Sequence, residues 1–378
     1  MPFFDLKENY SFGVYVLYFL HGTCFSTWAS RIPFIQQKLQ VSDAHLGFLL
    51  FAIPIGDLLT MPFSGWAITK WGSRRLMRYA LPLYASALVT LGYADTKVYF
   101  VAGLLLFGIA SNFVNICVNT QSVLVQRRFD KSIMASFHGV WSLAGFLGAL
   151  FGTWMMSWHV VVHAHFLYVG SAVCLIFVLV YPSLLKDEGE GGKASMFRKP
   201  DSSLLSLGFL ACCCMACEGA MFDWSGIYFE KVVLADEKWV GLGYAAFMGT
   251  MTMGRFFSDR FISFFGIRPV LMGSGVLIAG GLAFAVTFPL LASATFGFCL
   301  VGFGVSSVVP IVYGQAGKSQ KVPPPIALAM VSTIGFLGFL FGPPLVGTVA
   351  EMVDLRLSFA LIALMGIGLA IGSKFVVK

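Results

Sequence analysis

Charged residues are scarce in this sequence of 378 residues, at 11% of the chain. A soluble domain carries about 25%, so the chain lacks the ionic surface that a water-soluble fold needs. Hydrophobic residues make up 58% and are spread along the whole length, which excludes a disordered chain, a secreted disulfide scaffold and a nucleic-acid-binding domain. Long apolar runs are present instead, and they indicate a polytopic membrane protein.

Patterns that support covalent or metal chemistry are missing as well. The eight Cys residues lie inside apolar runs, and the cluster at 212–217 has no second Cys or His pair at the spacing of a zinc site. Neither a phosphate-binding loop nor a nucleophile beside a base is found. We therefore expect a protein that is not an enzyme and holds no cofactor or metal, in which these Cys residues pack at a close helix–helix contact.

Twelve apolar stretches of about the length that crosses a bilayer follow one another along the chain. They cover residues 10–35, 45–69, 75–94, 98–125, 133–157, 160–183, 203–231, 237–261, 268–288, 290–316, 324–349 and 354–376. They predict an all-α membrane protein with twelve transmembrane helices in two six-helix bundles. A charged, Gly-rich segment divides the bundles. The predicted parts are an N-terminal bundle (1–183), a cytoplasmic linker (184–202) and a C-terminal bundle (203–378).

Lys and Arg residues are distributed unevenly among the loops. If both termini are cytoplasmic, nineteen of the 25 fall on cytoplasmic segments, as the positive-inside rule requires. We therefore expect an integral protein of the bacterial inner membrane with both termini in the cytoplasm. Its partners are expected to be the lipid bilayer, a small hydrophilic substrate and protons, without nucleic acid, and the protein is expected to be a monomer.

The two halves of the chain repeat one another. Residues 145–152 match residues 335–342 at seven of eight positions, and both segments are rich in Gly. Two parallel six-helix repeats are the architecture of alternating-access carriers, in which the binding site lies between the halves near the midplane. We expect the glycines to let helices approach closely and to form the surfaces along which the halves move.

The segment 65–75 resembles the signature loop between the second and third spans of the major facilitator superfamily. Its matching residues are Gly65, Lys70, Gly72, Arg74 and Arg75. Thr69 stands where the family usually has Asp, so the acid of the family's cytoplasmic charge latch is missing here. The resemblance covers the whole chain, and segments 218–225 and 338–344 are similar to the fucose-permease-like branch of bacterial carriers. It implies a gating role for the charged residues Arg74, Arg75, Arg255 and Asp259. Arg31 is a further gating candidate.

Three carboxylates interrupt the apolar spans. A charged group at the centre of a span costs about 2.5–3.5 kcal/mol on insertion scales, so each is a functional candidate. Glu218 lies near mid-depth of the seventh span, and we expect it to couple proton binding to substrate binding, with a structural ion pair as the alternative. Asp57 and Asp223 are further candidates for proton coupling. Asp223 is also expected to pair with Arg31, as an outer gate or as a plain structural ion pair.

Polar residues of the fourth span share one helical face. Asn112, Asn115 and Asn119 recur at helical spacing. Carboxamides both donate and accept hydrogen bonds, which suits the hydroxyls of sugars or other polyols, and polar contact between helices is the alternative. Further candidates for substrate binding are aromatic or amide side chains elsewhere in the spans. They are His21, Trp28, Gln121, His138, Trp141, Tyr313 and Gln315.

The sequence thus predicts a secondary active transporter that works by alternating access. It is expected to import a small hydrophilic solute, such as a monosaccharide or polyol, together with protons. A drug or metabolite exporter is the alternative within transport, since the abundant Phe and Met residues would suit an apolar cavity. A non-transporting membrane receptor or scaffold on a carrier fold is the alternative from another class.

Overall fold

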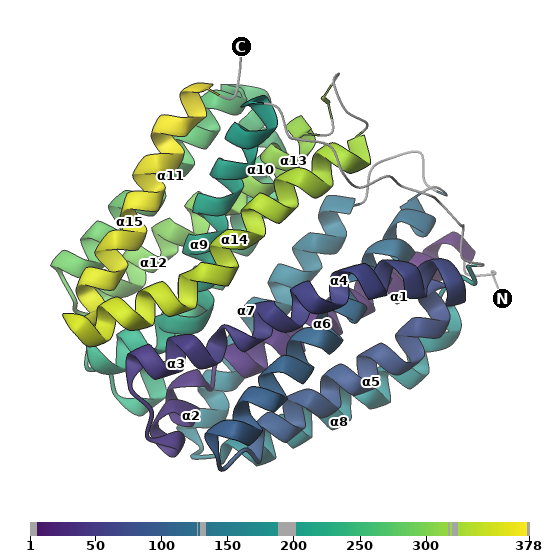
Figure 1. The fold of residues 1–378 in the computed structure, drawn as a ribbon, viewed down its shortest axis with the longest axis horizontal. Coiled ribbons are helices and arrows are strands. Elements are labelled where there is room, and N and C mark those ends of the chain that lie inside the picture. The colour runs from purple at the N-terminus through teal and green to yellow at the C-terminus, as the bar shows by residue number, and fades with distance from the viewer. Residues whose placement is uncertain are drawn as a thin grey trace. The chain divides into compact units, whose positions relative to one another are not determined.

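The chain is almost entirely helical. The computed structural model describes residues 6–126, 128, 134–187, 202–316, 318–319 and 324–375, and these form helices, turns and short loops with no strand among them (Figure 1). Each of the twelve predicted apolar stretches holds an α-helix. Within the described residues, nine helical stretches are long and apolar enough to cross a membrane. The predicted all-α membrane fold is confirmed.

The first compact unit comprises Met1–Gln40 and Ala52–Lys193. Its helices are α1 (Leu6–Ala29), α2 (Ile32–Leu39), α4 (Ala52–Trp71), α5 (Ser73–Gly92), α6 (Lys97–Gln126), α7 (Met134–Ser157), α8 (Val162–Val180) and the 3-10 turn η1 (Tyr181–Ser183). Helix α1 packs on α7, α6 packs on α4 and α5, and α5 packs on α8. Fully buried aromatic and aliphatic side chains fill the space between them.

The second compact unit comprises Val41–Phe51 and Ala194–Lys378. Its helices are α3 (Asp43–Leu50), α9 (Ser202–Lys231), α10 (Leu242–Phe265), α11 (Ile267–Thr287), α12 (Leu291–Ser306), α13 (Val308–Ala316), α14 (Pro324–Met352) and α15 (Leu355–Gly372), with 3-10 turns η2 (Glu237–Trp239) and η3 (Ser373–Phe375). Helix α14 packs on α9, while α12 packs on α10 and α11. This packing places α9 at the centre of the unit.

Helix α3 precedes α4 in the chain but packs on α14 of the second unit. The Lys231 ammonium, at the end of α9, lies 2.5 Å from the carboxylate of Asp43. The carboxylate of Glu351 accepts a hydrogen bond from the backbone N–H of Ala44 at 3.0 Å. The predicted span at 45–69 is therefore split between two helices, and the division of the chain by packing differs here from its division by sequence halves.

The repeated glycines make close helix contacts inside each unit. A Cβ at Gly148 of α7 would collide with Ser26 of α1, and a Cβ at Gly338 of α14 would collide with the backbone of Cys212 in α9. The expected close approach is confirmed. The same pairing, α7 on α1 and α14 on α9, occurs once in each unit, as a duplicated arrangement requires. These contacts hold helices together within each unit, and the role of the glycines in movement of the halves stays a prediction.

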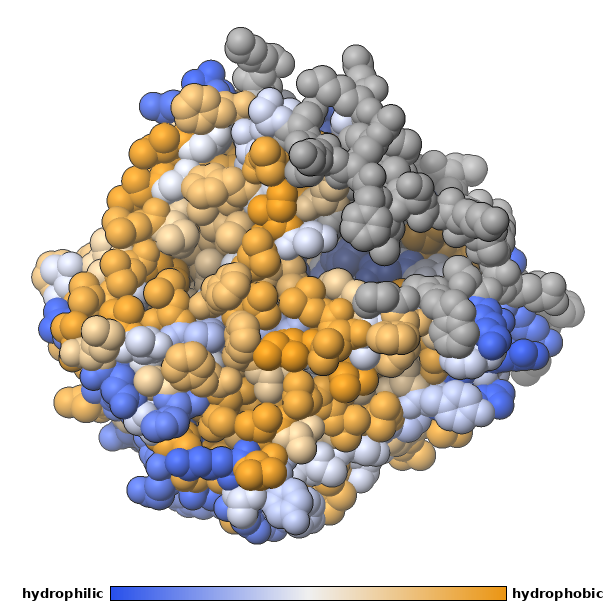
Figure 2. Space-filling view, viewed as in Figure 1, coloured by the Kyte–Doolittle hydropathy of each residue, from blue (hydrophilic) through white to orange (hydrophobic). Residues whose placement is uncertain are grey.

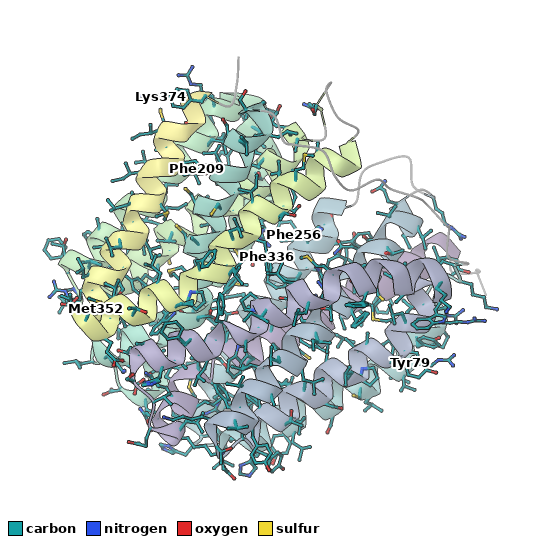
Figure 3. All side chains as sticks on the ribbon, viewed as in Figure 1. Tyr79, Phe209, Phe256, Phe336, Met352 and Lys374 are labelled. Carbon is teal, nitrogen blue, oxygen red and sulfur yellow. The ribbon has the colours of Figure 1, made fainter. Side chains whose placement is uncertain are left out.

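Hydrophobic side chains reach the surface in both units. They cover much of the face that is visible in Figure 2. Large exposed side chains include Tyr79 on α5, Phe209 on α9 and Met352 at the end of α14 (Figure 3). A soluble protein does not expose apolar residues on this scale without a partner. The surface is that of a protein whose helices contact the hydrocarbon of a bilayer.

Candidate functional site

The polar face of α6 meets α1 at Tyr18. The hydroxyl of Tyr18 donates to Asn119 Oδ1 at 2.9 Å, and the amide of Asn119 donates to Asn115 Oδ1 at 2.9 Å. Asn115 is exposed. A chain of three hydrogen-bonding side chains therefore ends at an exposed carboxamide. Sequence reasoning missed Tyr18, although it lies one helical turn before His21 on the first span.

Asn112 belongs to the same stripe but has a different environment. It is buried, and its Oδ1 accepts a hydrogen bond from Ser64 of α4 at 2.9 Å. This contact joins α4 to α6, so it fits the alternative interpretation of the stripe as polar contact between helices. Asn112 and Asn115 thus divide the predicted stripe into a packed part and an accessible part.

Aromatic rings lie beside the accessible part of the stripe. The imidazole of His21 is 3.3 Å from the hydroxyl of Ser111, and its ring lies 6.3 Å from that of Trp141, centroid to centroid. His138 is exposed, and its ring packs edge-on against Tyr18 at 5.1 Å. The half-buried Trp141 offers a ring face for stacking against a solute.

Two predicted substrate-binding residues are enclosed instead. Trp28 is fully buried, with its ring 5.8 Å from Phe100 and 6.2 Å from Phe107. Gln121 is also fully buried, and its amide bonds to the hydroxyl of Ser73 and the backbone of Leu185. Both side chains therefore pack within the first unit, and a role in substrate binding stays a prediction for each.

Arg31 is bound inside the first unit, just after α1. Its Nε donates to His165 Nδ1 at 3.1 Å, and its Nη2 donates to the carbonyl of Val160 at 2.9 Å. The side chain is buried. The predicted pair of Arg31 with Asp223 would join the two units, and it stays a prediction.

The remaining first-unit candidates lie apart from the stripe. Arg74 stacks over the ring of Tyr181 at 5.0 Å, and Arg75 is exposed on the first turn of α5. Asp57 is half-buried on α4. The two arginines thus flank the turn between α4 and α5, where the signature resemblance had placed them.

The centre of the second unit holds an ion pair. Arg255 Nη2 of α10 lies 3.8 Å from Glu218 Oε1 of α9, and the two side chains are only 16% and 7% exposed. The thiol of Cys214, one turn before Glu218, lies 3.7 Å from the same carboxylate oxygen. Sequence reasoning assigned Glu218 to coupling and Arg255 to a gate, but the structure brings the two residues together in one cluster.

Polar side chains of α13 and α14 lie near this ion pair. The hydroxyl of Tyr313 on α13 is hydrogen-bonded to Ser332 on α14 and lies within electrostatic range of Glu218. Gln315 follows on the same short helix and is half-buried. Three helices (α9, α10 and α13) therefore supply polar groups near one buried carboxylate, and α14 supplies the partner of Tyr313.

Asp223 and Asp259 are two further acids of the second unit that the sequence singled out. Asp223 is half-buried one turn beyond Glu218 on α9, beside Tyr244 of α10. Asp259 is part of α10, but its side chain lies outside the described residues.

Comparisons with known proteins agree with this architecture. The family model described as Major Facilitator Superfamily matches residues 14–324. An uncharacterised MFS-type transporter of Yersinia pestis is 32% identical over 96% of this chain and 94% of its own length. The membrane protein MosC of Rhizobium meliloti is 31% identical over 95% of this chain and 88% of its own length.

Solved structures show a similar fold. The nucleoside transporter NupG has a TM-score of 0.74 at 17% identity and covers 98% of this chain and 99% of its own. A bacterial homolog of the human lysosomal transporter Spinster, solved inward-facing and unoccupied, has a TM-score of 0.73 at 14% identity, with coverage of 99% and 98%. At these identities the likeness concerns the fold.

Proposed function

Since this chain belongs to the major facilitator superfamily, whose members are transporters, we propose that it imports a small hydrophilic solute, such as a monosaccharide or polyol, together with protons. The observation that carries the proposal is the buried pair of Glu218 and Arg255, 3.8 Å apart. A buried ion pair is a costly way to join two helices, and apolar residues of the same volume often do so equally well. Its presence in a span therefore favours a functional role.

The coupling step follows from the charges of this pair. While Glu218 is ionised, its charge compensates that of Arg255, and α9 and α10 are held together. When Glu218 takes up a proton, Arg255 loses the negative charge that lay 3.8 Å away, and the attraction between α9 and α10 weakens. The contact between α9 and α10 then has two arrangements with different energies, and the proton selects between them.

Solute binding is assigned to the accessible part of the α6 stripe. Asn115, Asn119 and Tyr18 offer donors and acceptors that match hydroxyl groups. Trp141 adds an aromatic face that can pack against the apolar side of a sugar ring. The described residues of this group carry no formal charge, which suits a neutral solute.

Uptake into proteoliposomes tests the proposal. The wild type is given a panel of labelled monosaccharides and polyols, with an acidic exterior and a more alkaline interior. We expect accumulation of at least one member above equilibrium. Glu218→Gln should abolish this accumulation and retain counterflow, which needs solute exchange but no net proton movement.

Glu237→Gln is the matched control, because it makes the same chemical change on the exposed turn η2. It should accumulate solute like the wild type. Accumulation by Glu218→Gln, or loss of accumulation in both variants, would contradict the assignment of coupling to Glu218.

A nucleoside is the second candidate solute. Trp141 can stack on a planar base, and carboxamides can pair with its edges. One protein of similar fold is named as a nucleoside transporter. Adding labelled uridine to the panel separates the two classes, and drug efflux in place of uptake would favour the exporter.

The proposal includes a topology. Both termini are placed in the cytoplasm of a bacterial cell, with a six-helix bundle on either side of the linker at 184–202 and a monomer as the working form. Protease accessibility of tags at each terminus in inside-out vesicles tests the orientation, and both tags should be cleaved there.

A further inference from the structure

The chain that leaves α8 binds back onto the first unit through Asp187. Oδ2 of Asp187 accepts a hydrogen bond from the backbone N–H of Ser73 at 2.6 Å, and Oδ1 accepts one from the N–H of Arg74 at 3.1 Å. These are the first two N–H groups of α5, which have no partner within the helix. A carboxylate at this end of a helix is favoured both by charge-assisted hydrogen bonds and by the helix dipole.

The turn before α5 has a conformation that lets Asp187 lie close to the start of the helix. Its N-cap residue is Gly72, which has no side chain with which to cap the helix. Gly72 has φ +76°, a left-handed conformation that favours glycine, and a Cβ there would collide with the carbonyl of Asp187. The absence of a side chain at Gly72 therefore creates both the unsatisfied helix end and the space that Asp187 fills.

Gln121 forms a second anchor for the same segment. Its Nε2 donates to the carbonyl of Leu185 at 2.9 Å, and its Oε1 accepts from the N–H of Leu185 at 3.0 Å. Nε2 also lies 2.8 Å from the hydroxyl of Ser73. Gln121, Leu185 and Ser73 are all buried, so this amide joins α6, the start of α5 and the segment after α8 in one place.

Tyr181 supplies the third contact. Arg78 Nε donates to its hydroxyl at 3.1 Å, and the guanidinium of Arg74 lies 5.0 Å from its ring centroid. The segment 181–187 is therefore fixed at three points, and it orients Arg74 next to the turn between α4 and α5.

We infer that Asp187 is a positioning residue for transport: it supplies the turn between α4 and α5 with the carboxylate that the sequence lacks at Thr69. The carboxylate holds the start of α5 and the beginning of the connection between the two units together, so they move as one piece. Asp187 contacts none of the residues assigned to the solute. Its loss should therefore lower the rate of the transport cycle and leave the affinity for solute unchanged.

The first test measures the contact itself and is independent of any solute. Hydrogen exchange is followed by mass spectrometry in the full-length protein in detergent. Asp187→Ala should accelerate exchange at the first turn of α5, by about fivefold for loss of one to two hydrogen bonds. Lys186→Ala, a change at the exposed neighbouring residue, should leave that exchange as in the wild type. Equal exchange in Asp187→Ala and the wild type overturns the inference.

The second test separates positioning from folding. Counterflow is measured in proteoliposomes with the monosaccharides, polyols and uridine used above, normalised to folded protein. Asp187→Ala should lower the maximal rate about fivefold with KM within twofold of the wild type. Asp187→Asn should fall between them, because its amide oxygen still accepts one hydrogen bond. A changed KM, or an unchanged rate in a variant whose exchange is faster, overturns the positioning role.

The inference depends on the chain being a transporter and not on which solute it carries. If the wild type exchanges none of these compounds, the proposed solute classes fail, and hydrogen exchange alone decides whether Asp187 holds the turn. The two failures are therefore distinguishable.

Discussion

The carboxylate of Glu218 and the guanidinium of Arg255 lie 3.8 Å apart at the centre of the second unit, almost out of reach of solvent. Each charge is tolerated there because the other is present. Neither residue can then be altered without changing the environment of its partner, and the consequences for stability can be measured separately from transport.

Removing one member of this pair should cost more stability than removing both. Arg255→Met leaves Glu218 without its cation, and we expect a loss of about 3 kcal/mol in the free energy of unfolding. The double variant with Glu218→Gln should lose less, since no buried charge remains unpaired. Thermal unfolding in detergent measures both. A double variant less stable than the single one would contradict this account of the pair.

The two parts of the α6 stripe should respond differently to substitution. Asn115→Ala removes an exposed amide, so we expect little change in stability and a KM for solute raised about tenfold, which corresponds to roughly 1.4 kcal/mol. Asn112→Ala leaves Ser64 without its acceptor in a buried site, and we expect a loss of about 1–3 kcal/mol in stability. Counterflow kinetics and thermal unfolding of the same two preparations supply the comparison. A loss of stability in Asn115→Ala together with a raised KM in Asn112→Ala would contradict this assignment of the two residues.

Arg31 should not be replaceable by Lys. Its guanidinium donates through Nε to His165 and through Nη2 to Val160 at the same time, and an ammonium does not reproduce this fixed geometry. We expect Arg31→Lys to lower stability by about 1–3 kcal/mol. Lys38→Arg, on the more exposed helix α2, is the control and should have little effect. Thermal unfolding in detergent measures the change. If Arg31→Lys is as stable as the wild type, these two hydrogen bonds do not contribute to stability.

The close contact of α14 with α9 should exclude even one methyl group. Gly338→Ala would push a Cβ into the backbone of α9, and we expect a loss of about 1–3 kcal/mol. Gly273→Ala is the matched control, because no atom lies within 4 Å of its added Cβ. That change should be neutral or stabilising by up to about 1 kcal/mol, since Ala favours a helix more than Gly does. Equal melting temperatures for the two variants would contradict the packing argument.

The helices could be predicted because the bilayer imposes a simple rule on sequence. Continuous apolar runs of sufficient length can only be helices in lipid, so each predicted stretch holds one. The same rule identified Glu218 as a functional candidate, because a charged side chain within such a run costs free energy. The sequence also showed that Arg255 is a charged residue in a span, but not that it pairs with Glu218. The sequence does not show which faces of two helices are in contact.

The contacts of Tyr18, Gln121 and Trp28 could not be predicted for a similar reason. Tyr18 was missed because a Tyr within an apolar span looks like any other aromatic residue in the sequence. Its hydrogen bond to Asn119 becomes apparent only when α6 is seen to pack near α1. The hydrogen bonds of Gln121 to Ser73 and Leu185 could not be predicted, because the match with Gln315 in the other repeat indicates a corresponding position and not a contact. Trp28 was a candidate for stacking until the rings of Phe100 and Phe107 were seen to enclose it. Each case depends on contacts between residues that lie at least 48 positions apart in the sequence.

Helix α3 has a consequence for how this chain can be divided experimentally. A fragment that begins at residue 203 contains one complete sequence repeat but leaves out a helix that packs on its α14. Backbone at Pro343, which approaches Gly47 of α3 too closely to admit a side chain there, would then be uncovered. The second compact unit therefore differs from the second sequence repeat. It includes eleven residues, 41–51, that belong to the first repeat. Split-protein and half-exchange designs should therefore carry α3 with the second half.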